Sequence, residues 1–143
     1  MMKIADDDKV YELLDQWHDE DEYDQILQTI FEIPREEWSN KLWFRVISAY
    51  NNKEEFSNAI EELEQMKEHC SSVKDIAKWH YMYAYIFYAN NQYVVAKNLL
   101  DKSVEADPEN EDYASLKEEC QEYIDKKIDV LREILTYIRE VAE

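Results

Sequence analysis

The chain has 143 residues with 34 acidic and 16 basic side chains, a formal net charge of −18, no glycine and two prolines. This length suits one folded domain with its own core, and the lack of glycine argues against tight hairpins, β-bulges and the glycine-rich phosphate loops of nucleotide-binding folds. An all-α fold is therefore predicted. The negative charge disfavours nucleic acid and anionic membranes and favours a basic partner, although it could also serve solubility alone.

Two further features indicate the cellular compartment in which the protein is expected to reside. The first residues, MMKIADDDK, contain no apolar signal region, and no run in the chain approaches 18 apolar residues, so we expect a cytoplasmic protein without membrane contact. Cys70 and Cys120 lie far apart, outside any CxxC motif and within helical patterns. They are predicted to be reduced, partly buried core residues.

Residues 6–33 carry the first pair of predicted helices, which are separated by an acidic turn at residues 19–21. Asp6, Asp7 and Asp8 favour a helix N-terminus, where carboxylates cap free N–H groups. Pro34 ends the second helix because it lacks the N–H that a helix interior needs. The two apolar stripes are Tyr11, Leu13, Leu14 and Trp17, followed by Tyr23, Ile26, Leu27, Ile30 and Ile33.

Two clearer copies of this pattern follow. In each copy one apolar stripe precedes an Asn-Asn pair and a second stripe comes after it. Asparagine tolerates the left-handed conformation that closes a helix, so Asn51-Asn52 and Asn90-Asn91 are predicted to form the two turns. The stripes contain Trp38, Trp43, Val46, Ile47, Tyr50, Phe56, Ala59, Ile60, Leu63 and Met66 in one copy, and Trp79, Tyr83, Ala84, Phe87, Tyr93, Ala96, Leu99, Leu100 and Val104 in the other.

The best-formed copy, residues 77–110, resembles a tetratricopeptide repeat. It has the order of aromatic residue, small residue, asparagine turn, Tyr, Ala, aliphatic residues and Asp-Pro of that helix-turn-helix unit of about 34 residues. Setting Ile26, Ala59 and Ala96 as equivalents gives intervals of 33 and 37 residues. On this alignment residues 7–39, 40–76 and 77–110 resemble three repeats of the small bacterial type, within a single domain of residues 1–143.

The resemblance implies a right-handed α-α superhelix of three helical hairpins and a long C-terminal helix. Leu14 and Ile47 depart from the pattern, because the family prefers a small residue where two helices come close. Ser71-Ser72 offers a loop and a new helix cap before the third unit.

Residues 111–143 contain no helix breaker and keep an apolar helical stripe. The first half is expected to cap the stack. An unbroken helix would span about 50 Å, so its second half needs another burial: a partner subunit, the protein's own groove, or a bend near residues 125–127. We expect a continuous or gently bent helix, with a weak homodimer as one consequence.

The sequence contains no recognisable catalytic or metal-binding motif. His18, His69 and His80 lie in different hairpins without a metal-ligand spacing, and no Ser/His/Asp or Cys/His group has local support. Paired carboxylates lie on stretches that are predicted to be solvated. We therefore expect no metal, no cofactor and no enzymatic activity.

In tetratricopeptide repeats the first helix of each pair lines a concave groove, and the resemblance transfers this face to the chain. Tyr81, Tyr85 and Tyr88 would make the groove aromatic at one end, and Glu12, Asp15 and Asp19 would make it acidic at the other. The alternative is that the C-terminal helix or a neighbouring subunit covers the tyrosines. The residues expected to contact a partner are Tyr11, Asp15, Phe44, Arg45, Lys78, Tyr81, Met82, Tyr85 and Tyr88; His18, Lys41, Ser48 and Asn52 share the same face.

The resemblance implies a module that holds a protein or peptide segment, expected to be basic or mixed apolar and basic. Some related cochaperones clamp acidic chaperone tails with Lys, Asn and Arg, but of the five matching positions only Lys78 fits and Asp15 would repel such a tail. The chain also resembles small bacterial tetratricopeptide proteins, some of them encoded near toxin and immunity genes, and its charge would suit an acidic immunity protein that masks a basic toxin. It is similar as well to chaperones of type III secretion translocators. The structural alternative is a homodimer through residues 124–141 without a peptide ligand.

Overall fold

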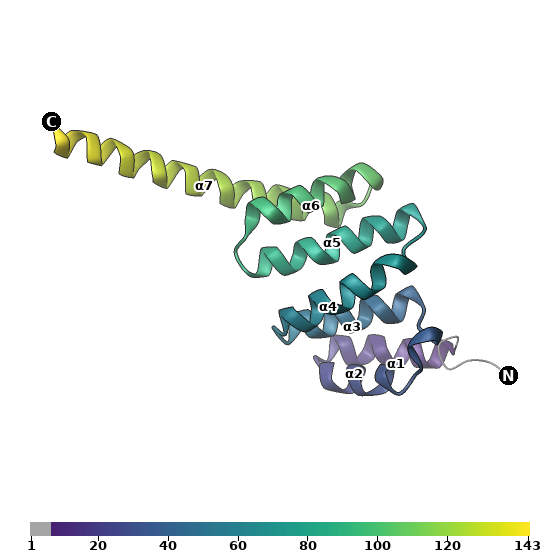
Figure 1. Ribbon diagram of the computed structural model, residues 1–143. Coiled ribbons are helices and arrows are strands. Elements are labelled where there is room, and N and C mark those ends of the chain that lie inside the picture. Colours follow the sequence, from purple (N-terminus) through teal and green to yellow (C-terminus); the bar gives the residue numbers. More distant parts are fainter. Residues whose placement is uncertain (1–6) are drawn as a thin grey trace.

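The computed structural model describes residues 7–143, and within them the chain forms seven α-helices, two short 3-10 helices and no strand (Figure 1). The all-α prediction is confirmed for these residues. The helices are α1 (Asp8–Asp19), α2 (Tyr23–Phe31), α3 (Asn40–Asn52), α4 (Phe56–Met66), α5 (Val73–Ala89), α6 (Tyr93–Ala106) and α7 (Glu111–Ala142), with 3-10 turns η2 (Arg35–Glu37) and η3 (Lys67–His69).

Each helix packs against the next along the chain, and α3 also contacts α5. Side-chain caps fix where four of the helices begin. Asp7 accepts a hydrogen bond from the Lys9 N–H, and Ser72 accepts one from the Asp75 N–H, so both predicted caps are present. Asp6 lies outside the described residues. Because Ser72 is the cap, α5 begins at Val73, one turn before the expected start at residue 77.

Three identical turns join α1 to α2, α3 to α4 and α5 to α6. In each turn one residue has a positive φ: Asp21 (59°), Glu54 (60°) and Asn91 (64°). The N–H of the following residue donates to a carbonyl five positions back, with lengths of 2.8 Å, 2.9 Å and 2.9 Å. This is the bond that ends a helix in a Schellman motif. The turn residues recur at the intervals of 33 and 37 expected from the sequence.

The prediction for the turns was right at Asn91 and wrong at Asn51-Asn52. Helix α3 continues through Asn52, and Glu54 adopts the left-handed conformation instead. The register of the whole hairpin decides which residue takes the positive φ, and a glutamate accepts that conformation at a modest cost. The asparagine preference is too weak to move the turn.

The interior consists of two apolar clusters, one built by α1 to α5 and one by α5, α6 and α7. The equivalent residues Ile26, Ala59 and Ala96 are all fully buried, at 0% exposure. Leu14 and Ile47, the two departures from the small-residue pattern, are also buried, because the neighbouring helices accommodate them.

Helix α7 is unbroken from Glu111 to Ala142, as predicted. Its first half buries Tyr113, Leu116 and Cys120 against the preceding helices. Its second half projects from the body as an arm, which is the yellow end of the ribbon in Figure 1. Within residues 7–143 no helix combines the length and the apolar character needed to cross a membrane.

Candidate functional site

A hollow of about 370 Å³ opens between α1, α3 and α5, the first helices of the three hairpins. We call it the α1–α3–α5 hollow. Six of the nine residues expected to contact a partner lie together here: Tyr11, Asp15, Phe44, Arg45, Lys78 and Met82. The remaining lining residues are Leu14, Lys41 and Ser48.

The floor of the hollow is apolar and firmly held. Leu14 is 1% exposed and Phe44 is 5% exposed, so each belongs to the core as well as to the hollow. The Tyr11 hydroxyl shares a hydrogen bond of 2.7 Å with the Ser39 hydroxyl, which also caps α3 by accepting from the Leu42 N–H. This link ties α1 to the start of α3. The floor is therefore a rigid apolar surface rather than a mobile loop.

The rim of the hollow is basic. Lys41 Nζ lies 5.5 Å from the centre of the Tyr11 ring, and Lys78 Nζ lies 4.8 Å from the centre of the Phe44 ring. Arg45 donates to the Asp15 carboxylate at 2.5 Å. Both lysines thus lie over aromatic faces, where a cation is attracted to the negative face of the ring. Among the described residues Asp15 is the single carboxylate in the lining, and Arg45 already pairs with it.

The surroundings of Lys78 affect its pKa. The pKa of Lys78 is lowered from its ordinary value, first by burial of its ammonium group and then by the nearby positive charge of Arg45, with a smaller contribution from Lys41. Asp75 opposes this shift only in part. The ammonium of Lys78 is therefore partly desolvated and lies near a second cation, with Asp75 as a partial counter-charge.

The lining contains the basic residues of the expected groove face but only part of its expected acidic end. Glu12 and Asp19, which were expected to supply negative charge, do not line the hollow, whereas three basic residues do. The expected repulsion by Asp15 is also reduced, because Arg45 pairs with its carboxylate. The ion pair between Asp15 of α1 and Arg45 of α3 contributes to this balance.

Tyr81, Tyr85 and Tyr88 of α5, which were expected to contact a partner, do not line the hollow. Tyr81 packs against Tyr113 of α7 with ring centres 4.8 Å apart, and burial, followed by the charge of Asp112, raises the pKa of Tyr81 to about 12. The Tyr88 hydroxyl donates to Glu119 of α7 at 2.5 Å. Tyr85 remains 38% exposed. Helix α7 thus occupies part of the aromatic surface that was expected to face a partner.

Three lining residues were not among the expected contact residues. Lys41 and Ser48 were on the face that the resemblance transferred to α3, so the helical period could have found them. Leu14 was assigned to the core alone. No signal in the sequence shows that a core residue also forms the floor of a hollow.

The function of this chain is inferred from the geometry of the α1–α3–α5 hollow. No protein-family model matches the chain, and a search of curated proteins returns no significant match.

Proposed function

We propose that this chain is a right-handed solenoid of three tetratricopeptide-like hairpins that binds an extended segment of a partner protein in the α1–α3–α5 hollow. The repeated Schellman turns and the intervals of 33 and 37 residues support the repeat assignment. The hollow lies along the first helices of the hairpins, the surface that repeat solenoids offer to partners.

The observation that carries the proposal is the basic rim in a chain of net charge −18. Lys41, Arg45 and Lys78 lie around one apolar floor, and among the described lining residues only Asp15, paired with Arg45, carries a negative charge. Lysine and arginine bind carboxylates through charge-assisted hydrogen bonds, and the buried Phe44 offers an apolar contact beside them. The ligand for this hollow is accordingly a segment with an acidic side chain, or a terminal carboxylate, next to an apolar residue. This reverses the sign expected from net charge alone.

The experiment compares three capped peptides of equal length, built from leucine alternating with glutamate, glutamine or lysine. Binding is followed by amide chemical shifts in two-dimensional NMR, which also locate the contact. The Leu/Glu peptide should shift amides around Lys41, Phe44 and Lys78 and bind best. Tighter binding of the Leu/Lys peptide there would support a basic ligand, and no localised shift with any of the three peptides would contradict the proposed function.

Two lysine variants sharpen the test. Lys78→Ala should weaken binding of the Leu/Glu peptide about tenfold, because a hydrogen bond to a charged group contributes roughly 1.5 kcal/mol. Lys102→Ala is the matched control, since Lys102 is an exposed lysine on α6 outside the hollow. Equal losses in the two variants would indicate a general charge effect and not a site.

A further inference from the structure

The second half of α7 has no neighbour within the described part of the chain. Tyr93, the first residue of α6, stacks on Tyr123 of α7 with ring centres 4.4 Å apart and planes 9° apart. Beyond this pair α7 extends past the N-terminal end of α6. Every residue of α7 from Asp125 onward, and Glu143 after it, is exposed. Figure 1 shows this part as the projecting arm.

The arm carries a wide apolar face in two rows. One row, at heptad spacing, is Ile128, Leu131, Leu135 and Ile138; the other is Val130, Ile134, Tyr137 and Val141. These eight side chains are 41–67% exposed. The second row continues the same three-and-four spacing as Tyr113, Leu116, Cys120 and Tyr123, so the face that packs on the body in the first half of α7 continues uncovered along the arm.

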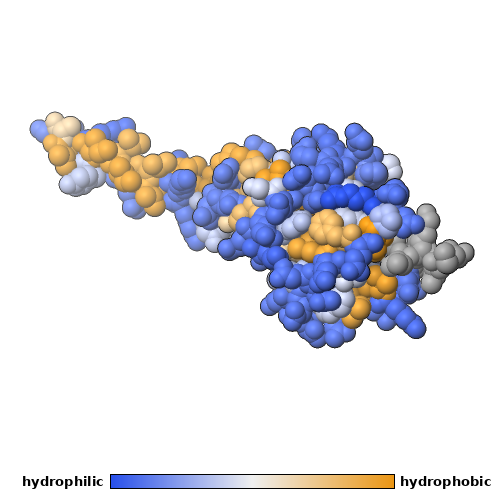
Figure 2. Space-filling view, turned by 60° about the horizontal axis from the view of Figure 1, so that its bottom comes forward, coloured by the Kyte–Doolittle hydropathy of each residue, from blue (hydrophilic) through white to orange (hydrophobic). Residues whose placement is uncertain are grey.

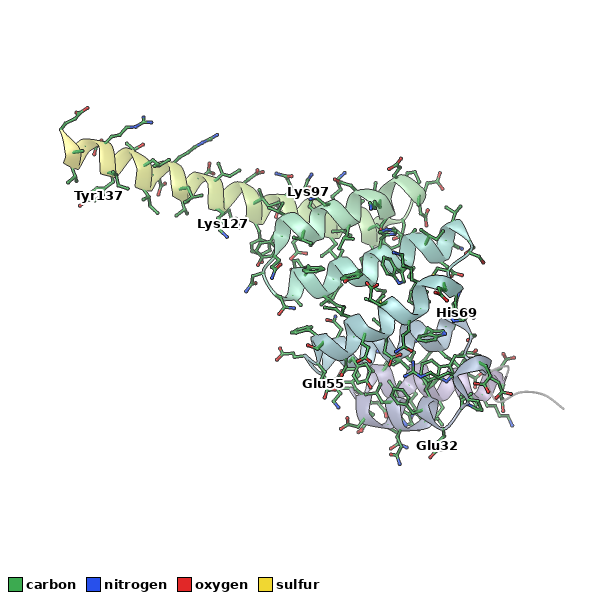
Figure 3. The ribbon with its side chains drawn as sticks, in the orientation of Figure 1. Glu32, Glu55, His69, Lys97, Lys127 and Tyr137 are labelled. Carbon is green, nitrogen blue, oxygen red and sulfur yellow. The ribbon has the colours of Figure 1, made fainter. Side chains whose placement is uncertain are left out.

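The figures agree with this pattern. Apolar surface extends along much of the arm in Figure 2. Lys127 and Tyr137, which belong to the row that includes Val130 and Val141, point to the same side of the arm in Figure 3. A continuous apolar face of this size on a soluble helix marks an interaction surface.

We propose that a second copy of this chain covers the arm, and that the two α7 helices pair antiparallel in a two-fold symmetric dimer. In this arrangement Leu131 lies opposite the partner's Leu135, Ile128 opposite the partner's Ile138, and Ile124 opposite the partner's Ala142. In each pair a residue at heptad position a faces a residue at position d of the partner helix, which is the pairing expected for antiparallel helices. The interface is isologous, with each copy using the same surface.

The free length of the arm supports this register. The segment that extends beyond Tyr123 runs from residue 124 to residue 142 and is about 28 Å long. Its midpoint is residue 133, which is also the midpoint between Leu131 and Leu135. Two arms paired about that point cover each other fully. The C-terminal end of the partner's α7 then lies next to the N-terminal end of α6. These two helices lie end to end along α7.

A second hollow marks the place where the partner's helix would end. It has a volume of about 480 Å³ and lies between the start of α6 and the middle of α7. Val94 and Val95, on its α6 side, are 59% and 40% exposed. The proposed register brings the partner's Ile138 and Val141 to this hollow. The remaining lining residues are Asn91, Gln92, Tyr93, Ile124, Lys127, Ile128 and Leu131.

Charge also favours a second copy over a strongly charged partner. Residues 126–143 contain four basic and four acidic side chains, so the arm is neutral in a chain of net charge −18. Antiparallel pairing places the two acidic bodies at opposite ends of the paired arms and sets Asp125 on the same flank as the partner's Arg139. Parallel pairing would place the two acidic bodies at the same end of the paired arms, where their charges repel each other.

The area is sufficient for a stable dimer. Covering the four side chains of the first row and the flanking Ile134 and Val141 removes on the order of 100 Å² each from water, or on the order of 600 Å² per protomer. The total of about 1,200 Å² lies at the lower end of the range for stable interfaces.

The first test is the mass in solution, measured by sedimentation velocity from low to high micromolar concentration. The full chain should show twice the monomer mass of 17.3 kDa. Leu135→Glu should weaken the dimer at least about a hundredfold, since two copies each lose a buried leucine and place a charge in the interface. Thr136→Glu is the matched control, because it adds the same charge one residue away on the opposite flank. A monomer at all concentrations, or equal effects of the two variants, would overturn the proposal.

The second test fixes the direction of the helices by disulfide trapping. Ile128→Cys mixed with Ile138→Cys should form a heterodimeric disulfide under mild oxidation, whereas either variant alone should not. In the antiparallel register two copies of residue 128 are ten residues apart along the axis, about 15 Å, beyond the reach of a disulfide. Efficient self-linking of Ile128→Cys would overturn the antiparallel arrangement.

Discussion

Arg35 donates two hydrogen bonds, each 2.8 Å long, to the two oxygens of the Glu62 carboxylate. Glu62 lies on α4 with its side chain 7% exposed, and the Arg35 guanidinium also lies 4.7 Å from the centre of the Trp38 ring. The Glu62 carboxylate is the largest cause of the raised pKa of Arg35. This bidentate ion pair holds the segment between α2 and α3 against α4.

Removing the arginine should destabilise the protein. Arg35→Ala leaves the Glu62 carboxylate buried without its partner, and we expect the free energy of unfolding to fall by about 3 kcal/mol in urea denaturation. Replacing both residues by methionine should recover much of that loss, because the desolvated charge is then absent. A double variant as unstable as Arg35→Ala would show that aromatic packing, and not the ion pair, is the main contribution.

The left-handed turn residue Glu54 offers a stabilising substitution. With φ at 60°, its side chain disfavours the conformation that glycine adopts freely. Glu54→Gly should raise the free energy of unfolding by up to about 1 kcal/mol. Asn58→Gly, in the exposed interior of α4, should lower it by roughly 0.5 kcal/mol and serves as the control. The same sign for both variants would contradict the turn geometry.

Burial of Tyr81 predicts a loss of stability at high pH. Its pKa is raised from 10.0 to about 12 in the folded protein. The unfolded chain therefore releases the phenolic proton first, and stability falls as the pH rises from about 10 to 12. The free energy of unfolding should decline less steeply in Tyr81→Phe than in the unsubstituted protein. Tyr85→Phe, which changes an exposed tyrosine of the same helix, should follow the unsubstituted protein; an unchanged slope in Tyr81→Phe would contradict the prediction.

The two cysteines are free thiols with low expected reactivity. Burial and the charge of Asp75 raise the pKa of Cys70 to about 11, and burial also raises the pKa of Cys120, whose side chain is fully buried. Because the thiolate is the nucleophile, both should react slowly with a disulfide reagent near neutral pH, with Cys70 faster than Cys120. Urea should make both react rapidly. Fast labelling of Cys120 in the folded protein would indicate that α7 opens from α6.

Much of the fold follows from patterns of neighbouring residues and could be predicted from the sequence. Apolar side chains at intervals of three and four residues defined the helices, serine and aspartate marked where helices begin, and the absence of a breaker after residue 111 left one long helix. These features involve residues within a few positions of one another. The turn at Glu54 was missed because it depends on the register of a whole hairpin and not on the residue itself.

The character of the hollow is a property of the tertiary structure. The expected contact residues Asp15 and Arg45 are 30 positions apart, and only the packing of α1 on α3 pairs them and leaves the rim basic. Likewise Tyr81 and Tyr88 follow a clear helical period, yet α7 contacts them from more than 30 residues away. Periodicity shows which side chains share a face of a helix. Which neighbour covers that face, and the sign of charge left at its edge, follow from contacts between helices distant in the sequence.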